Sequence, residues 1–179
     1  MNLTILTDAH AVAGDPGLLE TVRDTLFSRC SDDQLLMAHF ARPVLQFATP
    51  LNLFGSLKKP LHGIDIKKGA LFPLVHGVRA MALQCRIRET STLARLDKLV
   101  AAGAMEPGFA EDLGEAMELF SELRLSRQLA KLQGEDETVE DNHIVVQQLS
   151  SLERDVLRDA LHLVSEFKQR LSRRFHLEY

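Results

Sequence analysis

About 25 residues near the end of the chain carry an apolar stripe that repeats at close to the period of an α-helix. Ser150 and Glu153 stand at the spacing of a capping box just before it, so the helix is predicted to begin there. A second helix is predicted from about Pro107 to Gln133, with Gly134 as its stop signal. Two helices of this length joined by a modest loop are expected to be antiparallel neighbours in a bundle. The stripe consists of Leu152, Val156, Ala160, Leu163, Phe167 and Leu171.

Shorter helix signals precede these two. Asp15 followed by Pro16 predicts one helix start, and Ser31 with Gln34 forms a capping box for the next helix, which Pro43 should kink or split. Residues 49–63 have no periodicity and are predicted to be a loop. Residues 64–68 start extended and lead into a helix over about 69–86 that is apolar nearly all round, so it is expected to be the most buried helix. A further short helix is capped near residues 90–92 and ends before Gly103.

The composition agrees with helices. Leu and Ala dominate, aromatic residues make up only 6%, and Trp is absent. The exception is the N-terminal stretch LTILTDAHAV, whose β-branched residues favour a strand that pairs elsewhere or lies over the helices as an arm. The predicted fold class is therefore all-α: a bundle of about five to six helices with a short extended N-terminal arm.

Charge and cysteine content narrow the possible partners and the compartment. A formal net charge of −4 does not by itself attract nucleic acid or an acidic membrane. Cys30 and Cys85 have no partner motif, which indicates a reducing compartment. The N-terminus lacks a basic region and a long apolar run, so we predict no signal peptide, no membrane association and a cytoplasmic location.

Motifs for nucleotide binding and catalysis are missing. The sequence has no phosphate-binding loop, no dinucleotide fingerprint, no nucleophile elbow and no helical His pair at zinc spacing, and we predict no bound metal. One near-miss resembles the Gly-Ser and paired-carboxylate motif of polymerase-β-type nucleotidyltransferases, in which two carboxylates hold metal ions. Gly55, Ser56 and Asp65 fit that pattern, but Lys67 replaces the second carboxylate and the spacing is short. We therefore interpret this segment as a loop.

Several polar residues stand on or beside apolar helices, where packing does not need them. Arg on such faces usually meets a carboxylate or a phosphate. Two interpretations stay open. The residues either form internal salt bridges, such as Arg79 with Glu115 or Glu118, or line a pocket for an anionic or nucleotide ligand. The candidates are Asp65, Lys67 and Lys68 before the buried helix, His76 and Arg79 on it, and Arg124, Arg127 and Gln128 on the long helix.

Five segments in a fixed order carry a resemblance to a known family. They are IDIKKGALFPLVHGVRAMAL, TSTLARLDKLVAAG, LRLSRQL, DN and LSSLERDVLRDAL. Over roughly residues 16–175 the chain resembles the nucleotidyltransferase substrate-binding domain. That domain stands at the carboxyl end of bacterial proteins that often also carry cyclic-nucleotide-binding, CBS and nucleotidyltransferase domains. The resemblance implies a helical bundle akin to the helical domains of enzymes that uridylylate or adenylylate regulatory proteins.

The resemblance extends to the N-terminus. TDAHAVAGD looks like the end of the family's nucleotidyltransferase domain, where the pattern is Asp-x-Arg-x-Val-x-Gly-Asp. Asp8 then matches a strand carboxylate that would be a third catalytic carboxylate, although His10 replaces the usual Arg. We expect residues 1–15 to be a remnant of that domain and 16–179 to be the helical substrate-binding domain, which makes the chain a fragment of a longer protein.

By this resemblance the chain is a non-catalytic domain that presents a protein or a small anionic substrate to a nucleotidyltransferase core in signal transduction. The substrate-binding candidates are Asp65, Lys67, Arg79, Arg124 and Gln128. No cofactor is expected in this chain, whereas Mg²⁺ and a nucleoside triphosphate are implied for the full-length protein. The family has a run of Arg-Leu-Arg-His-Gln, and at its third and fourth positions this chain has Ser126 and Arg127. Farther on, Val145 and Val146 replace the Asp-Pro pair that the family pattern has after Asn142.

Two other functions stay open. The bundle could be an interaction module that forms a homodimer or docks against CBS domains, and an exposed apolar patch near Leu51, Leu53 and Phe54 would favour it. An enzyme in its own right would need an acid–base constellation, which the sequence does not offer.

Overall fold

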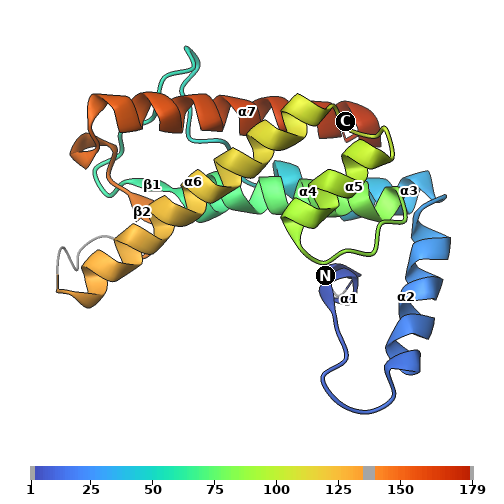
Figure 1. The fold of residues 1–179 in the computed structure, drawn as a ribbon. Coiled ribbons are helices and arrows are strands. Elements are labelled where there is room, and N and C mark those ends of the chain that lie inside the picture. The colour runs from blue at the N-terminus through green and yellow to red at the C-terminus, as the bar shows by residue number, and fades with distance from the viewer. Residues whose placement is uncertain (1–2, 135–139, 178–179) are drawn as a thin grey trace. The chain divides into compact units, whose positions relative to one another are not determined.

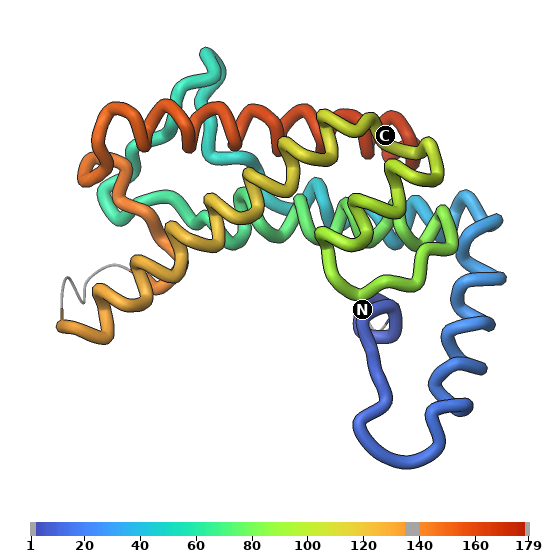
Figure 2. Tube along the Cα trace, in the orientation of Figure 1, coloured from blue at the N-terminus to red at the C-terminus, as the bar shows by residue number. Residues whose placement is uncertain are grey.

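Helices make up most of the molecule (Figures 1 and 2). The computed structural model describes residues 3–134 and 140–177, and within them there are seven α-helices and one two-stranded sheet. The predicted all-α class is confirmed. The helices are α1 (Leu3–Asp8), α2 (Pro16–Cys30), α3 (Gln34–Ala41), α4 (Phe72–Gln84), α5 (Thr92–Ala101), α6 (Pro107–Leu132) and α7 (Ser151–Phe175), and the strands are β1 (Ile64–Asp65) and β2 (His143–Ile144).

The chain divides into two compact units. The first comprises residues 1–43, 75–111 and 171–179, and the second comprises residues 44–74 and 112–170. The first unit therefore contains α1, α2, α3 and α5, whereas α4, α6 and α7 contribute residues to both units. None of the described helices combines the length and the hydropathy that a membrane span requires.

The N-terminal stretch is helical, so the predicted strand over LTILTDAHAV is wrong. Residues Leu3–Asp8 form α1, and residues 9–15 after it have no regular structure. The Thr7 hydroxyl donates to the carbonyl of Thr4 at 2.8 Å, and the Thr7 side chain is buried. Propensity favoured a strand, but the described residues of this unit offer no partner strand, and the burial of Thr7 favours the helix instead.

Side-chain caps set the starts of the early helices. Asp15 accepts from the backbone N–H of Gly17 at 2.8 Å, as its position before Pro16 predicted. The predicted Ser31–Gln34 capping box is wrong, because Asp33 is the N-cap and accepts from the N–H of Leu36 at 2.9 Å. Asp33 wins since its carboxylate reaches the third helical N–H directly. Pro43 ends α3 as predicted, and a 3-10 helix at Arg42–Leu45 follows.

The long helices of the second unit follow their sequence signals. α6 ends at Leu132 and Gly134 has a φ of 81°, as the stop signal predicted. The Ser150–Glu153 capping box is present: the Ser150 N–H donates to the Glu153 carboxylate at 2.7 Å, and the Glu153 N–H donates to the Ser150 hydroxyl at 3.2 Å. In Figure 1, α6 and α7 run in opposite directions, in agreement with the expected antiparallel arrangement. The core residues of α6 and α7 in this unit include Leu113, Phe120, Leu157, Leu161, Val164 and Phe167.

The small sheet connects the loop region to the segment that follows α6. β1 and β2 are antiparallel, with Ile64 opposite Ile144, and the Ile66 N–H donates to the Asn142 carbonyl at 2.9 Å. β1 then passes through a π-helical segment at Lys67–Leu71 into α4, so the predicted change from extended chain to helix is confirmed. α4 is largely buried along its length, also as predicted.

Gly63 allows this sheet to form. It has a φ of +81°, and a Cβ on it would lie 2.7 Å from the carbonyl oxygen of Ile144. Gly103 has a similar φ of +66°, but its Cβ would meet no atom within 4 Å. Substitution of Gly103 by Ala therefore measures the cost of a left-handed backbone alone, whereas substitution of Gly63 by Ala adds the cost of a steric clash.

We predict that Gly63→Ala lowers the free energy of unfolding by at least about 2 kcal/mol, whereas Gly103→Ala lowers it by about 1 kcal/mol. The extra loss at Gly63 arises because the Ile144 carbonyl cannot move away without disturbing the β1–β2 pair. Urea denaturation followed by circular dichroism measures both values. Equal losses in the two variants would contradict the assigned clash.

Candidate functional site

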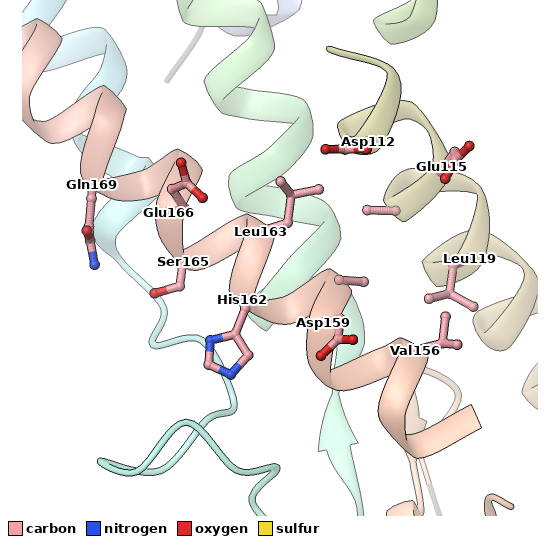
Figure 3. Close-up of a pocket in the computed structure, with 12 residues that line it drawn as sticks. Asp112, Glu115, Leu119, Val156, Asp159, His162, Leu163, Ser165, Glu166 and Gln169 are labelled. Atoms are coloured by element: carbon pink, nitrogen blue, oxygen red, sulfur yellow. The ribbon is translucent and has the colours of Figure 1, made fainter. Parts of the chain in front are cut away.

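A groove runs between α6 and α7 in the second unit. One part of it is a hollow of about 710 Å³ whose side chains come from these two helices (Figure 3). Its floor is apolar and its rim is polar, which is the usual arrangement of a binding site. The lining residues are Ala116, Leu119, Val156, Ala160 and Leu163, with Asp112, Glu115, Asp159, His162, Ser165, Glu166 and Gln169. We call this part the acidic half of the groove.

Carboxylates dominate the electrostatics of the acidic half. Asp112, Glu115, Asp159 and Glu166 are exposed, and neither Lys nor Arg is among the residues that line this hollow. Arg170, one turn beyond Glu166, binds its carboxylate at 2.7 Å, and Arg158 pairs with the Asp159 carboxylate at 3.2 Å, so two of the four charges are offset. The groove therefore suits a ligand with an apolar side and positive charge.

A second hollow, of about 720 Å³, continues the groove toward the start of α7. It shares Leu119 and Val156 with the first, and it also borders β2 and the residues that follow β2. Its lining is more apolar than the acidic half, and Ser126, Arg127, Gln148, Glu122 and Glu153 supply the polar groups. The remaining lining residues are Leu123, Ala130, Ile144, Val145, Leu149 and Leu152. We call this part the apolar half.

Two of the predicted substrate-binding residues lie on α6 next to the apolar half. Arg124 and Gln128 flank Ser126 and Arg127, which line it. The Arg124 Nε donates to the Asn142 side-chain oxygen at 2.7 Å, and the Asn142 carbonyl accepts from Ile66. Arg124 thus fixes the segment before β2 against α6. It positions one wall of the groove through Asn142.

Asp65 and Lys67 have local contacts in the same unit. The Asp65 carboxylate accepts from the Lys68 N–H at 2.9 Å and pairs with the Lys68 ammonium at 3.3 Å. These contacts join Asp65 to the first turn of the π-helical segment at Lys67–Leu71 that leads into α4. Lys67 is exposed. The proposed substrate-binding roles of these two residues stay predictions.

The fifth candidate, Arg79, lies in the first unit and pairs with Asp8. Its Nε and Nη2 donate to one Asp8 oxygen at 3.0 and 2.5 Å, while Arg95 donates to the other at 2.6 Å. The predicted salt bridge of Arg79 with Glu115 or Glu118 is therefore wrong in its partner. Sequence spacing along a helix could not reveal an acid 71 residues away.

Arg95 is the most deeply buried charge of this cluster. Its side chain is 2% exposed, against 34% for Asp8. Besides Asp8, its guanidinium donates to the carbonyls of Glu89 at 2.6 Å and Thr7 at 3.2 Å. These bonds compensate the burial of the charge and hold α1 and the segment before α5 together. A hollow of about 510 Å³ lies beside the cluster, lined by Thr4, Ile5, Asp8, Ala9, His10 and Arg79.

The charges of the cluster shift two pKa values. Burial tends to raise the pKa of Asp8, but the hydrogen bonds and charges of Arg79 and Arg95 outweigh it, so the pKa is lowered. Burial lowers the pKa of His76, with a further contribution from the Arg79 charge. His76 Nε2 lies 2.7 Å from the Phe40 carbonyl and Nδ1 lies 3.3 Å from Arg79 Nη1, which fits a neutral ring with its proton on Nε2. Both oxygens of Asp8 are thus engaged by guanidinium groups, and its catalytic role stays a prediction.

The sequence reasoning missed the acidic half of the groove. A signal was present, because Asp112 and Glu115 lie three residues apart and Ala116 and Leu119 follow at helical spacing. These carboxylates resembled an ordinary solvated helix face. Only the packing of α7 against α6 brings Asp159 and Glu166 alongside them.

A comparison with protein families now gives the groove a context. A family model described as Putative nucleotidyltransferase substrate binding domain matches residues 34–175. The chain belongs to this family. The match contains all of α3 to α7, and thus both halves of the groove of this substrate-binding domain. No curated protein and no solved structure matches the chain.

Within residues 3–134 and 140–177 of the substrate-binding domain, no three or more His, Cys, Asp or Glu side chains are grouped closely enough to hold a metal ion. The donor set for Mg²⁺ is therefore not assembled from these residues, and we assign no step to a metal on them.

We predict that Asp8→Asn lowers the free energy of unfolding by about 1–2 kcal/mol at pH 7, because it leaves two guanidinium groups without their carboxylate. A third of the Asp8 side chain is exposed, which keeps the loss at this modest size. Asp8 has a lowered pKa in the folded protein, so its contribution exists above its unfolded pKa of about 3.9 and is lost as the pH falls through the lower folded value.

Urea denaturation of wild type and Asp8→Asn between pH 2.5 and 7 measures this difference. Asp32→Asn is the control, because Asp32 forms a pair with Arg86 at 2.6 Å in which both side chains are largely exposed. We expect it to change stability little at any pH. A stability difference for Asp8→Asn that does not shrink toward low pH would refute the role given to its charge.

Proposed function

We propose that this chain is a non-catalytic substrate-binding domain that holds the acceptor of a nucleotidyl-transfer reaction in the groove between α6 and α7. The observation that carries the proposal is the apolar half of that groove. It has a volume of about 720 Å³, an apolar floor, and polar groups from Ser126, Arg127 and Gln148 at its edge. Its size is in the range of sites that bind a ligand specifically.

The shape and charge of the groove favour a polypeptide acceptor over a small anionic molecule. The apolar half lies between α6, the start of α7 and the residues that follow β2, and this open hollow suits an extended or helical segment. Carboxylates at the acidic half repel a free phosphate or nucleotide that approaches from that end. A segment of a folded protein can place its apolar side chains on the floor and keep its polar groups at the rim.

Arg124 supports this role as a positioning residue. By binding Asn142, it fixes the chain before β2, and Ile144 and Val145 of that region form one wall of the apolar half. The predicted importance of Arg124 and Gln128 for substrate binding is thus proposed to act through the wall of the groove. Lys67 and Asp65 are proposed to contribute only by shaping the start of α4.

The chemical step is proposed to belong to a nucleotidyltransferase region of the full-length protein, with its Mg²⁺ and nucleoside triphosphate. In that arrangement the substrate-binding domain supplies orientation and proximity, which can accelerate a bimolecular step strongly without a catalytic side chain. CBS or cyclic-nucleotide-binding domains and a role in cytoplasmic signal transduction are part of the same proposal.

A second candidate function is a protein-interaction module. It is favoured by Leu53 and Phe54, which lie at the tip of the loop before β1 and are almost completely exposed. Exposed apolar side chains of this size on a well-formed loop mark a contact surface. The two functions are compatible, because the loop tip and the apolar half of the groove are formed by different residues.

We predict that Ser126→Trp raises the KM for a protein acceptor at least about tenfold and leaves the KM for the nucleotide unchanged, because the indole fills the apolar half of the groove. Label transfer from a radioactive nucleoside triphosphate, by a protein that carries this chain and its nucleotidyltransferase region, provides the assay. Ser121→Trp is the matched control, since Ser121 is exposed on α6 and is absent from the lining of both hollows. Equal kinetics of the two variants would remove the groove from the acceptor site.

A thermal-shift experiment tests the small-ligand alternative. We expect nucleotides, cyclic nucleotides and phosphorylated metabolites, with or without magnesium, to leave the melting temperature of this chain unchanged. A concentration-dependent rise with one of these compounds would instead indicate a small anionic substrate. Arg124→Leu would then be the variant with which to locate its binding site.

A further inference from the structure

The loop before β1 has a well-defined structure of its own. Leu51 and Leu57 form an antiparallel bridge, and the Asn52 side-chain oxygen accepts from the N–H groups of both Phe54 and Ser56 at 2.9 Å. Gly55 has a φ of +75°, which closes the turn. The tip of the loop is therefore held in one conformation by its own hydrogen bonds.

Two residues of α7 attach this loop to the second unit. His162 Nε2 lies at 2.7 Å from the carbonyl oxygen of Gly55, and the Lys168 ammonium donates to the carbonyl of Phe47 at 2.7 Å. Residue 55 has a φ of +75°, which favours glycine, and a Cβ there would lie 2.7 Å from the His162 ring, so a larger residue would also displace this imidazole. In Figure 1 the loop projects beyond α7.

The loop presents large apolar side chains to solvent. Phe54 is 93% exposed, Leu53 is completely exposed, and Leu61 follows at 83%. A flexible loop would bury such groups by collapsing onto the surface. Here the bonds of Asn52 fix the turn and the contact with His162 fixes its orientation on α7, and the side chains of Leu53 and Phe54 stay in solvent. Leaving this much apolar surface in water is unfavourable, and it is characteristic of a surface that is covered by a partner.

The charge of the loop is opposite to that of the groove. Residues 49–63 contain Lys58 and Lys59, both exposed, and have neither Asp nor Glu. The acidic half of the groove has four carboxylates above an apolar floor and neither Lys nor Arg in its lining, although Arg158 and Arg170 pair with two of these carboxylates, Asp159 and Glu166, from outside the lining. One surface is thus apolar and basic, the other apolar and acidic, and both belong to the same unit of the same chain.

We propose that the chain forms a homodimer in which the loop of residues 51–62 of each copy docks into the acidic half of the α6–α7 groove of the other copy. Leu53 and Phe54 cover the apolar floor of the groove, and Lys58 and Lys59 face its carboxylates. Two complementary patches on one chain are what a two-fold interface requires, because each contact then occurs twice. The complementary charges set the register and exclude other pairings.

The position of His162 supports the reciprocal docking of loop and groove in the dimer. It lines the acidic half of the groove and also contacts the Gly55 carbonyl in the turn of the loop, so the two surfaces lie on neighbouring sides of α7. A second copy that packs near this helix meets both surfaces together. The apolar half of the groove takes no part in the contact, so dimerisation and acceptor binding are independent proposals.

Charge exchange in two complementary variants tests the dimer. One variant, Lys58→Glu with Lys59→Glu, has an acidic loop and an acidic groove. The other, Glu115→Lys with Asp159→Lys, has a basic loop and a groove in which two of the four carboxylates are replaced by Lys. All four side chains are exposed, so the substitutions leave the core untouched. We expect each variant alone to be at least tenfold weaker in self-association than the wild type, and an equimolar mixture to form heterodimers, because both contacts become complementary again.

Sedimentation velocity over about 1–200 μM measures these states, with circular dichroism to verify that each variant is folded. Leu53→Asp with Phe54→Asp is expected to be monomeric, and Ser126→Trp is expected to dimerise like the wild type. A wild-type chain that stays monomeric over this range would overturn the proposal and leave the loop to a different protein. A dimer that persists in the charge variants, or variants that fail to recombine in the mixture, would overturn it too.

Discussion

The long helix α7 has one apolar face, and burial of that face is the constraint on which the second unit depends. Leu157, Leu161, Val164 and Phe167 are almost completely buried, and one such side chain contributes about 1.5–3 kcal/mol relative to exposure. Once this face is fixed, the directions of all other side chains of the helix are fixed as well. One edge of α7 then meets α6 across the groove, and His162 and Lys168 hold the loop region. The burial of this one face thus determines both where the groove forms and where the loop of residues 49–63 attaches.

In the first unit, a cluster of salt bridges holds three helices together. Asp8 of α1 accepts from Arg79 of α4 and Arg95 of α5, so one carboxylate joins three helices. Arg95 needs this partner, because an unpaired buried guanidinium is strongly unfavourable. The helical state of residues 3–8 follows from this attachment and from the burial of Thr7 more than from local propensity.

Helix positions were largely predictable because their signals are local. The capping box at Ser150, the glycine after α6 and the apolar surround of α4 act within a few residues, and the structure has each of them. The first helix was not predictable, because its conformation depends on Arg79 and Arg95, far away in sequence. The predicted salt-bridge partner of Arg79 was wrong for the same reason, since Asp8 is also far away in sequence. The cap of α3 differs in kind: Ser31 and Asp33 both fit local rules, and only the geometry selects Asp33.

The candidate site was predictable only in part. Arg124 and Gln128 were selected as polar residues on an apolar helix, and they do lie beside the apolar half of the groove. The acidic half requires side chains from residues 112 and 166 to come together, and no pattern along one helix shows that. The loop tip was identified as a possible contact surface from its apolar residues. Its rigidity depends on Asn52, Gly55 and His162, whose roles appear only in three dimensions.

The contact between Gly55 and His162 makes one position of the loop intolerant of substitution, whereas the neighbouring Leu53 and Phe54 are free to vary. A side chain at residue 55 would be strained by the φ of +75° and would displace the imidazole, so glycine is favoured at this position of the turn. Leu53 and Phe54 touch little else of the protein, and substitutions there have almost no stability cost to overcome. Two neighbouring positions can therefore diversify freely while the scaffold stays constant. In the proposed dimer, substitutions at these two residues alone would let related chains in one cell pair with themselves and not with each other.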